Sequence, residues 1–110
     1  MRWYQKIVQA HTAVTEKVSH FRQMQESRYM VWQEDGRNDF EAGNRHVEKA
    51  WTGTTDIFTT IEFDPWIDAL ENQFDALGIA YQLENIDYDD ETDVMHYAYS
   101  WEVKDGPADG

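Results

Sequence analysis

A change of hydrophobic period inside residues 53–78 constrains the fold more than any other feature of this sequence. Residues 56–63 alternate between two faces and are rich in Thr, Ile and Phe, which is typical of a strand. Apolar residues then recur every three or four positions, which is typical of an amphipathic helix. These helical positions are Trp66, Ile67, Leu70, Phe74 and Leu77. Because the strand and the helix each need an apolar partner, we expect both to share one core at the centre of a small domain.

Both ends of the predicted helix carry boundary signals. Asp64 precedes Pro65, and a residue before proline is held in extended backbone, which suits an N-cap. Proline at the first helical position gives up only an N–H that has no helical partner. Gly78 supplies the left-handed conformation that often follows a helix C-terminus. We therefore expect a strand that leads directly into a helix of about three or four turns.

Charge is unevenly divided along the chain. Ala50–Val103 contains thirteen Asp and Glu and no Lys or Arg, whereas Met1–Lys49 contains eight cations and seven anions. The net charge of −13 argues against direct nucleic-acid binding, which depends on cationic surfaces. The acidity therefore belongs to the second half of the sequence.

The carboxylates of the second half fall into two groups. The first recurs at helical spacing beside the apolar stripe and comprises Asp64, Asp68, Glu71 and Asp75. The second lies in one short loop and comprises Asp87, Asp89, Asp90, Glu91 and Asp93. Either group is a solvated surface or a face that repels polyanions or meets a cationic neighbour. The loop has oxygen ligands for Ca²⁺ but lacks the EF-hand spacing, so we interpret it as a solvated hairpin tip.

The remaining periodicities predict an α+β fold with the order α-β-β-β-α-β-β. We expect an antiparallel sheet of four to five strands with two helices packed on one face. The expected elements besides the capped helix are a helix over Trp3–Ser19 and strands over Arg28–Glu34, Phe40–Ala42, Val47–Phe63, Ile79–Asp87 and Val94–Val103.

Turn signals divide these elements. Asp35–Gly36 predicts a tight hairpin turn, Gly43–Asn44 predicts a turn or bulge, and Gly53 predicts a break in the long strand. Residues 1–103 are expected to form one domain, and residues 104–110 a disordered C-terminal tail.

The sequence contains no recognisable catalytic or cofactor motif. It has no cysteine, no phosphate loop and no GxSxG serine setting. The histidines form no HExxH or HxH pair; they are His11, His20, His46 and His96. We therefore expect a protein that is not an enzyme and has no metal or cofactor. We also expect no membrane span and no signal peptide, because no long apolar run is present.

Aromatic residues are abundant for a chain of this size. Five Trp, six Tyr and five Phe among 110 residues exceed what one small core needs. Tyr and Trp are common anchors of protein interfaces, so the surplus predicts an assembling subunit. The candidate interface aromatics are Trp3, Trp32, Trp51, Tyr97, Tyr99 and Trp101.

Four motifs give the chain a resemblance to a known family. They are the WQEDG segment at Trp32–Gly36, the strand Gly53–Thr59, the helix start Glu62–Asp68 and the closing strand His96–Val103. With them, most of Trp3–Val103 resembles a family of small proteins of Gram-positive long-tailed phages and prophages. That family is assigned to the tail-terminator group of head–tail joining and tail-completion proteins.

The resemblance implies an α+β subunit of a hexameric ring, which caps the finished tail tube and joins it to the head. The implied partners are further copies of the chain, the tail tube protein and the head–tail connector, without specific nucleic-acid binding. The implied location is the host cytoplasm during assembly and then the virion tail. In such a ring an acidic lumen would let DNA slide, and the near-neutral half of one subunit would meet the acidic half of the next.

A second function stays open from the sequence. Small acidic phage proteins can mimic DNA and inhibit a host nuclease or defence system. Such a mimic needs carboxylates spaced like phosphates along an exposed surface, whereas a terminator needs surfaces that contact its own copies.

Overall fold

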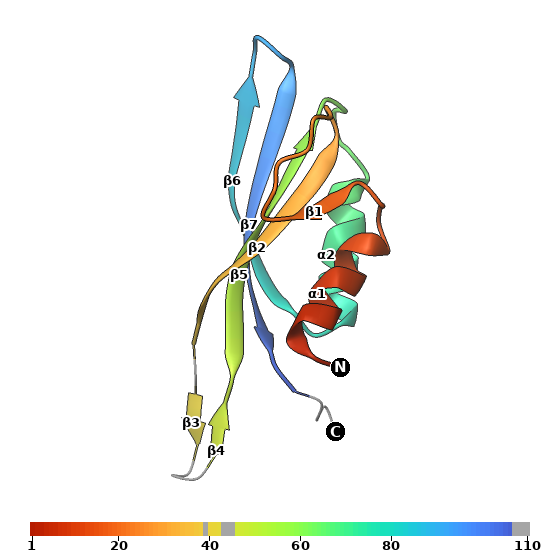
Figure 1. Cartoon of the computed structure of the whole chain (residues 1–110). Coiled ribbons are helices and arrows are strands. Elements are labelled where there is room, and N and C mark those ends of the chain that lie inside the picture. The colour runs from red at the N-terminus through yellow and green to blue at the C-terminus, as the bar shows by residue number, and fades with distance from the viewer. Residues whose placement is uncertain (39, 43–45, 107–110) are drawn as a thin grey trace.

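The computed structural model describes residues 1–38, 40–42 and 46–106 of the chain. Two helices lie on one face of a five-stranded mixed sheet (Figure 1), which confirms the predicted α+β class and element order. The elements are α1 (Trp3–Thr12), β1 (Val18–His20), β2 (Tyr29–Arg37), β3 (Phe40–Ala42), β4 (His46–Glu48), β5 (Ala50–Thr59), α2 (Trp66–Ala76), β6 (Ala80–Asp89) and β7 (Val94–Lys104).

The antiparallel pair β5–β7 is the centre of the sheet. Its register runs from the Ala50–Lys104 pair to the Thr59–Met95 pair. β2 joins β5 and β6 joins β7, both antiparallel, so the strand order is β1-β2-β5-β7-β6. β1 is the exception, because it pairs with β2 in parallel at one edge of the sheet. The short β3–β4 pair forms a separate two-stranded sheet.

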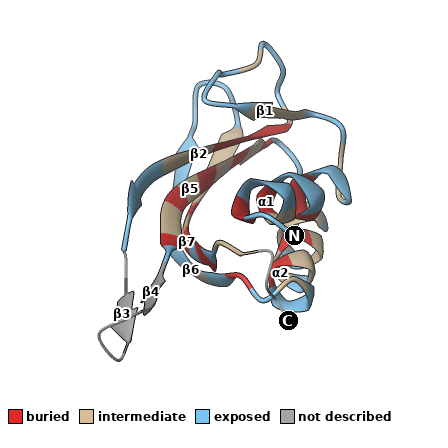
Figure 2. Ribbon diagram, turned by 60° about the horizontal axis from the view of Figure 1, so that its bottom comes forward, coloured by how far each residue is buried: buried red, intermediate tan, exposed pale blue. Residues whose placement is uncertain are grey.

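The core lies between the two helices and the facing side of the sheet. Figure 2 shows buried residues along the central strands beside α1 and α2. Fully buried contributors from the helices are Ile7, Ala10, Leu70 and Phe74, and from the strands Met30, Ile57, Tyr99 and Val103. Side chains therefore alternate along β5 and β7 as predicted, and those on one face of each strand pack in the core.

The break predicted at Gly53 is wrong. The strand continues through this residue, and the absence of a side chain is needed for packing. β5 continues through this residue, paired with Trp101 of β7. A Cβ at Gly53 would lie 2.3 Å from the Trp101 ring and 2.3 Å from the Gln33 carbonyl oxygen. The missing side chain thus allows the Trp101 indole to lie across the strand. The interruption occurs instead at Lys49, between β4 and β5.

The first helix is shorter than predicted. Its spacing continues through Val14 and Val18, but α1 ends at Thr12. The Thr15 hydroxyl oxygen accepts a hydrogen bond from the Lys17 N–H, a local turn that competes with helix. Val18 then pairs with Met30, so the predicted end of the helix is the edge strand β1.

The tight turn predicted at Asp35–Gly36 is wrong. β2 runs on to Arg37 with a register shift between Glu34 and Gly36, and the Asp35 carboxylate accepts a hydrogen bond from the Thr52 hydroxyl at 2.9 Å. This cross-strand bond suits a bulge rather than a reversal. The turn predicted at Gly43–Asn44 lies outside the described residues.

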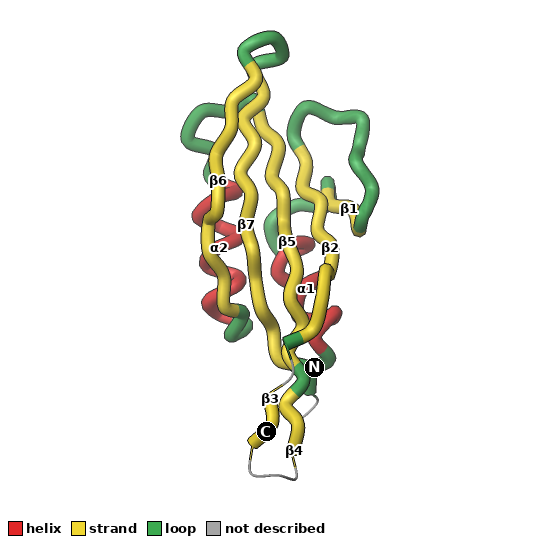
Figure 3. Tube along the Cα trace, turned by 90° about the vertical axis from the view of Figure 1, so that its left-hand side faces the viewer, coloured by secondary structure: helices red, strands yellow, loops and turns green. Residues whose placement is uncertain are grey.

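The molecule is elongated and measures 54 × 22 × 21 Å. The β3–β4 pair and the β6–β7 turn project from its opposite ends (Figure 3).

The strand-to-helix transition follows the prediction with shifted boundaries. β5 ends at Thr59 rather than Phe63, because the Thr59 hydroxyl oxygen accepts from the Ile61 N–H and turns the chain. α2 starts at Trp66, and Gly78 has the predicted positive φ of 71°. Phe63 also has a positive φ, 54°, a conformation that costs a residue with a side chain about 1–2 kcal/mol.

The predicted disorder of residues 104–110 does not hold at its beginning. Lys104 is part of β7, and Asp105 accepts hydrogen bonds from the Trp3 N–H at 3.2 Å and from the Arg2 guanidinium at 3.0 Å. The hydrogen bond from Arg2 holds the pKa of Asp105 below its usual value. The chain is therefore ordered to this carboxylate, which fixes the start of α1. Residues 107–110 lie outside the described part.

A buried polar triad orients α1 on the sheet. The Thr55 hydroxyl oxygen accepts from the Trp101 indole N–H at 3.0 Å, which leaves its own hydrogen for His11 Nε2 at 2.8 Å. His11 Nδ1 then donates to the Ile7 carbonyl oxygen at 2.7 Å. The hydrogen bonds of His11, Thr55 and Trp101 are all satisfied only when the His11 ring is neutral. Burial favours this neutral form, because it lowers the pKa of His11 from 6.5 to about 4.

We predict that His11 makes the protein lose stability in mild acid. Between pH 6.5 and 4 the unfolded chain binds a proton at this residue that the folded chain does not. The free energy of unfolding should therefore fall by about 2 kcal/mol from pH 7.5 to pH 5 through this group alone. Urea unfolding at both pH values measures this loss, and His11→Gln should remove it. An equal pH dependence in the variant would contradict the assignment.

We predict that Gly53→Ala destabilises the fold by about 1–3 kcal/mol, the usual cost of overpacking a core. The added methyl group would meet the Trp101 ring and a backbone carbonyl that cannot move away freely. Thermal unfolding followed by tryptophan fluorescence measures the change. Gly36→Ala is the control, because its Cβ would only approach the Thr52 hydroxyl, at 3.3 Å.

Candidate functional site

The described residues contain no cluster of side chains that could hold a metal ion. Across residues 1–38, 40–42 and 46–106, no group of three or more His, Asp or Glu side chains is arranged to hold a metal ion. None of the helices described is long and apolar enough to span a membrane. The sequence predicts the candidate site residues to be surface groups, and the structure shows which of them are exposed and which are buried.

Asp64 does not lie on the exposed acidic stripe that its spacing predicts. Its carboxylate is fully buried and accepts hydrogen bonds from the Arg28 guanidinium at 2.6 and 2.8 Å, from the Thr59 hydroxyl at 2.6 Å and from the Trp66 N–H at 2.9 Å. Burial by itself raises the pKa of Asp64, but these four hydrogen bonds outweigh it and the pKa is lowered. Asp64 thus ties the start of β2, the end of β5 and the start of α2 together.

Glu71 also does not lie on the exposed acidic stripe that its spacing predicts. It is half-buried and accepts a hydrogen bond from the Tyr99 hydroxyl at 2.6 Å, with the Tyr81 hydroxyl 3.5 Å away. Burial and this hydrogen bond raise the pKa of Tyr99. Of the four helical carboxylates, only Asp68 and Asp75 are exposed.

The loop carboxylates lie at the end of the β6–β7 hairpin, with Asp87 and Asp89 in the last residues of β6 and the other three in the turn. All five are exposed: Asp87, Asp89, Asp90, Glu91 and Asp93. The Tyr88 hydroxyl donates to Asp93 at 2.6 Å, and the Glu91 N–H donates to the Asp89 carboxylate, which shapes the turn. The tip extends beyond α2 (Figures 1 and 3), so the structure does not merge the helical and hairpin carboxylates into one patch.

Most candidate interface aromatics are core residues. Four of them are less than 9% exposed: Trp3, Trp32, Tyr99 and Trp101. Trp51 is half-buried and stacks on Trp3 with ring centroids 4.5 Å apart, and Tyr97 is half-buried against the core. Tyr99 and Trp101 are therefore not available to a partner, whereas Trp3 and Trp32 line a groove beside α1.

The large exposed hydrophobic side chains form two unlike groups, which sequence patterns did not single out. Among the described residues, one group lies on or near α1 and β1 and comprises Met1, Tyr4, Val8 and Phe21. The other belongs to the acidic half and comprises Ile61, Phe63, Leu83, Ile86 and Tyr88. Phe63 is 88% exposed, which is the largest value among them. Exposed apolar groups of this kind commonly mark interaction surfaces.

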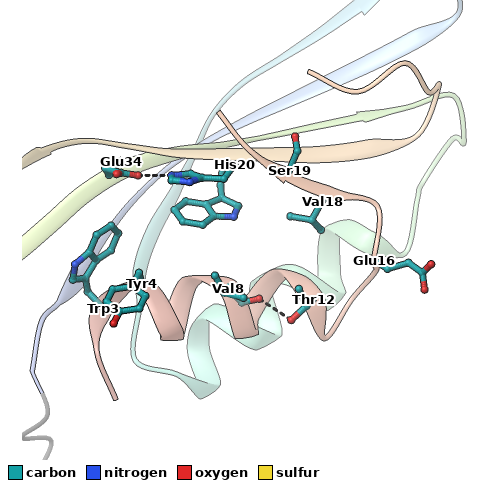
Figure 4. Close-up of a pocket in the computed structure, with 10 residues that line it drawn as sticks. Trp3, Tyr4, Val8, Thr12, Glu16, Val18, Ser19, His20 and Glu34 are labelled. Atoms are coloured by element: carbon teal, nitrogen blue, oxygen red, sulfur yellow. Dashed lines mark hydrogen bonds and ion pairs between the residues drawn. The ribbon is translucent and has the colours of Figure 1, made fainter. Parts of the chain in front are cut away.

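A groove of about 540 Å³, which we call the α1–β1 groove, opens beside the first group. Figure 4 shows Tyr4, Val8 and Thr12 of α1 facing Val18 and His20 of β1. The His20 ring stacks on Trp32 at 4.0 Å, and its Nε2 lies 2.7 Å from the Glu34 carboxylate, which defines one wall. The groove arises because β1 is only three residues long and leaves one side of α1 uncovered.

A second groove, of about 580 Å³, lies on the opposite face of the sheet near the hairpin tip. Its floor is a stack of three rings on neighbouring strands, Tyr29, Phe58 and His96, with centroids 4.9 and 4.5 Å apart. His96 Nε2 lies 2.6 Å from the Asp56 carboxylate. The ring stack stabilises the far end of the sheet.

Comparison with known proteins finds similarity to a solved structure. No family model matches the chain, and no curated protein matches it significantly. A solved structure titled "Virion of native gene transfer agent (GTA) particle" contains a chain that is similar to it at 8% identity and a TM-score of 0.47, covering 96% of this chain and 92% of that chain.

We predict that Asp64→Asn destabilises the fold by about 1.5–3 kcal/mol, the usual worth of hydrogen bonds to a charged group. The amide would lose the charge that holds Arg28 and part of its acceptor capacity. Asp68→Asn, one helical turn further on and exposed, is the matched control and should change stability by less than about 0.5 kcal/mol. Chemical unfolding of the two variants measures the difference, and equal values would contradict the assigned role.

Proposed function

We propose that this chain is a structural subunit of a phage-type tail, a tail terminator that closes the tail tube as a ring and joins it to the head. The proposal draws on the family resemblance of four motifs, Trp32–Gly36, Gly53–Thr59, Glu62–Asp68 and His96–Val103. The observation that carries it is structural: the subunit has two different and complementary edges.

The two edges differ in charge as well as in apolar groups. β1 and β6 are the outer strands of the sheet, and α2 contacts β6. Residues 1–27, which form α1, β1 and most of the following loop, contain four Lys and Arg and two Glu, and Arg28 is bonded to Asp64. Residues 60–93, which include α2 and β6, contain eleven Asp and Glu and no Lys or Arg. Unlike surfaces on one subunit favour a heterologous contact, which generates a ring when the rotation closes.

The exposed carboxylates suit a surface that DNA passes without binding. A passage for DNA requires repulsion of phosphates, and the hairpin tip supplies five carboxylates without a cation nearby in sequence. Asp64 and Glu71 take no part in this surface, because both serve internal hydrogen bonds. The candidate lumen residues on α2 are thereby reduced to Asp68 and Asp75.

The same exposed hairpin supports one competing function, that of a DNA mimic which inhibits a nuclease. Such a protein would act as a free monomer and would present its carboxylates to a cationic cleft. It has no need for a second, less acidic edge with exposed apolar groups, and this edge favours the terminator.

We expect the purified protein to form rings at the ends of tail tubes taken from particles of the phage or prophage that encodes it. Negative-stain microscopy of the mixture measures the fraction of capped tubes. Asp89→Asn, Asp90→Asn and Glu91→Gln combined should leave capping unchanged, because the tip is a lumen surface, and should slow DNA release from assembled particles. Uncapped tubes together with tight binding to a host nuclease would reject the terminator function and support the DNA-mimic function.

A further inference from the structure

We propose that the second groove, on the face of the sheet away from the helices, binds a basic segment of a partner protein by taking one of its lysine or arginine side chains. We call it the hairpin groove, because the β6–β7 hairpin forms one wall and residues 23–29 form the other. Figure 3 shows this face of the sheet without a covering helix. The inference does not depend on the proposed function, since it identifies a partner by its charge.

The charge of the hairpin groove is one-sided. Its lining contains three carboxylates, those of Glu26, Asp87 and Asp89, and no Lys or Arg among the residues that the structure describes. Glu26 is already paired with Lys17 at 2.7 Å, so the uncompensated charge is that of Asp87 and Asp89. These two carboxylates accept hydrogen bonds from neutral amide groups, which leave their charge in place. A cation at this wall would gain charge-assisted hydrogen bonds.

The floor of the groove offers an apolar surface for the stem of such a side chain. Tyr29, Phe58 and His96 stack across three neighbouring strands, and all three line the groove together with Val94. Lysine and arginine pack their methylene groups on surfaces of this kind and keep the charged end at the edge. His96 is paired with Asp87 in the register of β6 and β7, which places a carboxylate directly beside the ring stack.

The molecule already binds one of its own arginines with a ring and a carboxylate. The Arg28 guanidinium lies 3.9 Å from the centroid of the Trp66 ring and donates to both carboxylate oxygens of Asp64, at 2.6 and 2.8 Å. Aromatic and acidic groups thus combine in this fold to fix a cationic side chain. The hairpin groove presents the same two kinds of group to the outside.

The dimensions of the groove suit a segment of another protein. Its volume of about 580 Å³ lies within the usual range of binding pockets, which is roughly 300–1,000 Å³. Tyr88, which lies between Asp87 and Asp89 on the hairpin wall, is 59% exposed, and tyrosine is a common anchor of protein interfaces. A partner chain in the groove would therefore meet an aromatic group beside the two carboxylates.

A second copy of this chain has few free cations to offer. Arg2, Lys17 and Arg28 are each in an ion pair with a carboxylate of their own subunit. The Lys6 ammonium donates to the Lys104 carbonyl oxygen at 3.3 Å. The observations therefore favour a different protein with a basic loop or strand as the occupant of the groove.

A fluorescently labelled peptide of alternating glycine and arginine is the probe. Fluorescence anisotropy at physiological ionic strength should show saturable binding to the natural chain. Asp87→Asn combined with Asp89→Asn should weaken this binding by about fivefold or more, because it removes both uncompensated carboxylates of the groove. Asp68→Asn combined with Asp75→Asn is the matched control, since it makes the same change in net charge on exposed positions of α2. It should weaken binding by less than about twofold, as expected for screened charges at a distance.

Phe58→Ser tests the floor without a change of charge. The variant should bind the peptide about threefold or more weakly, because the stem of the arginine loses its apolar surface. Thermal unfolding establishes that the variant is folded. Val94→Ser, on the same floor, gives the same comparison with a smaller change in packing.

Equal weakening by the two double Asp→Asn variants would overturn the proposal, because the peptide would then be held by net charge alone. Unchanged binding by both floor variants would overturn it as well. Dimers of the natural chain that dissociate when Asp87 and Asp89 are replaced would assign the groove to a second copy and reject the different partner. Peptide binding at the groove by a chain that caps no tail tubes would support the groove and reject the terminator function, whereas capping without peptide binding would do the reverse.

Discussion

The pairing of β5 with β7 is the interaction on which the rest of the structure depends. It aligns Gly53 with Trp101 and Thr55 with Tyr99, so that a bare stretch of backbone lies under the largest ring of the core. Thr55 then links the Trp101 indole to His11 of α1. The ladder therefore determines the position of the first helix as well as that of the sheet, because a neutral histidine can satisfy its hydrogen bonds at only one place.

Asp64 has a comparable role at the other end of the core. A carboxylate that is removed from water needs several donors, and Arg28, Thr59 and the Trp66 N–H supply them from three separate elements. The loop before α2 is consequently rigid, although it carries an exposed phenylalanine. A group that looks like surface charge in the sequence thus controls which apolar side chain the surface presents.

The uneven distribution of charge along the chain explains why the two edges of the sheet differ. The cation-free half of the chain forms α2 and β6 at one edge, and the half that carries most cations forms α1 and β1 at the other. The order of strands, with the sequence-distant β5 and β7 in the middle, moves the two halves apart instead of mixing them. A difference that is only a trend along the sequence becomes a difference between two faces of the molecule.

What the sequence determined by itself is local. The switch of period before Pro65, the positive φ of Gly78, the short strand Phe40–Ala42 and the aromatic face of the last strand all follow from a few neighbouring residues, and so do the α+β class and its order. The concentration of acid in the second half is likewise a property of the chain alone. What the tertiary structure decided is exposure and pairing. Spacing cannot show that Asp64 has Arg28 as a partner, that Trp3 and Trp32 belong to the core, or that Val18 leaves its helix for the edge of β2. Burial depends on what the rest of the chain brings to a residue from a distance, and no local pattern contains that information.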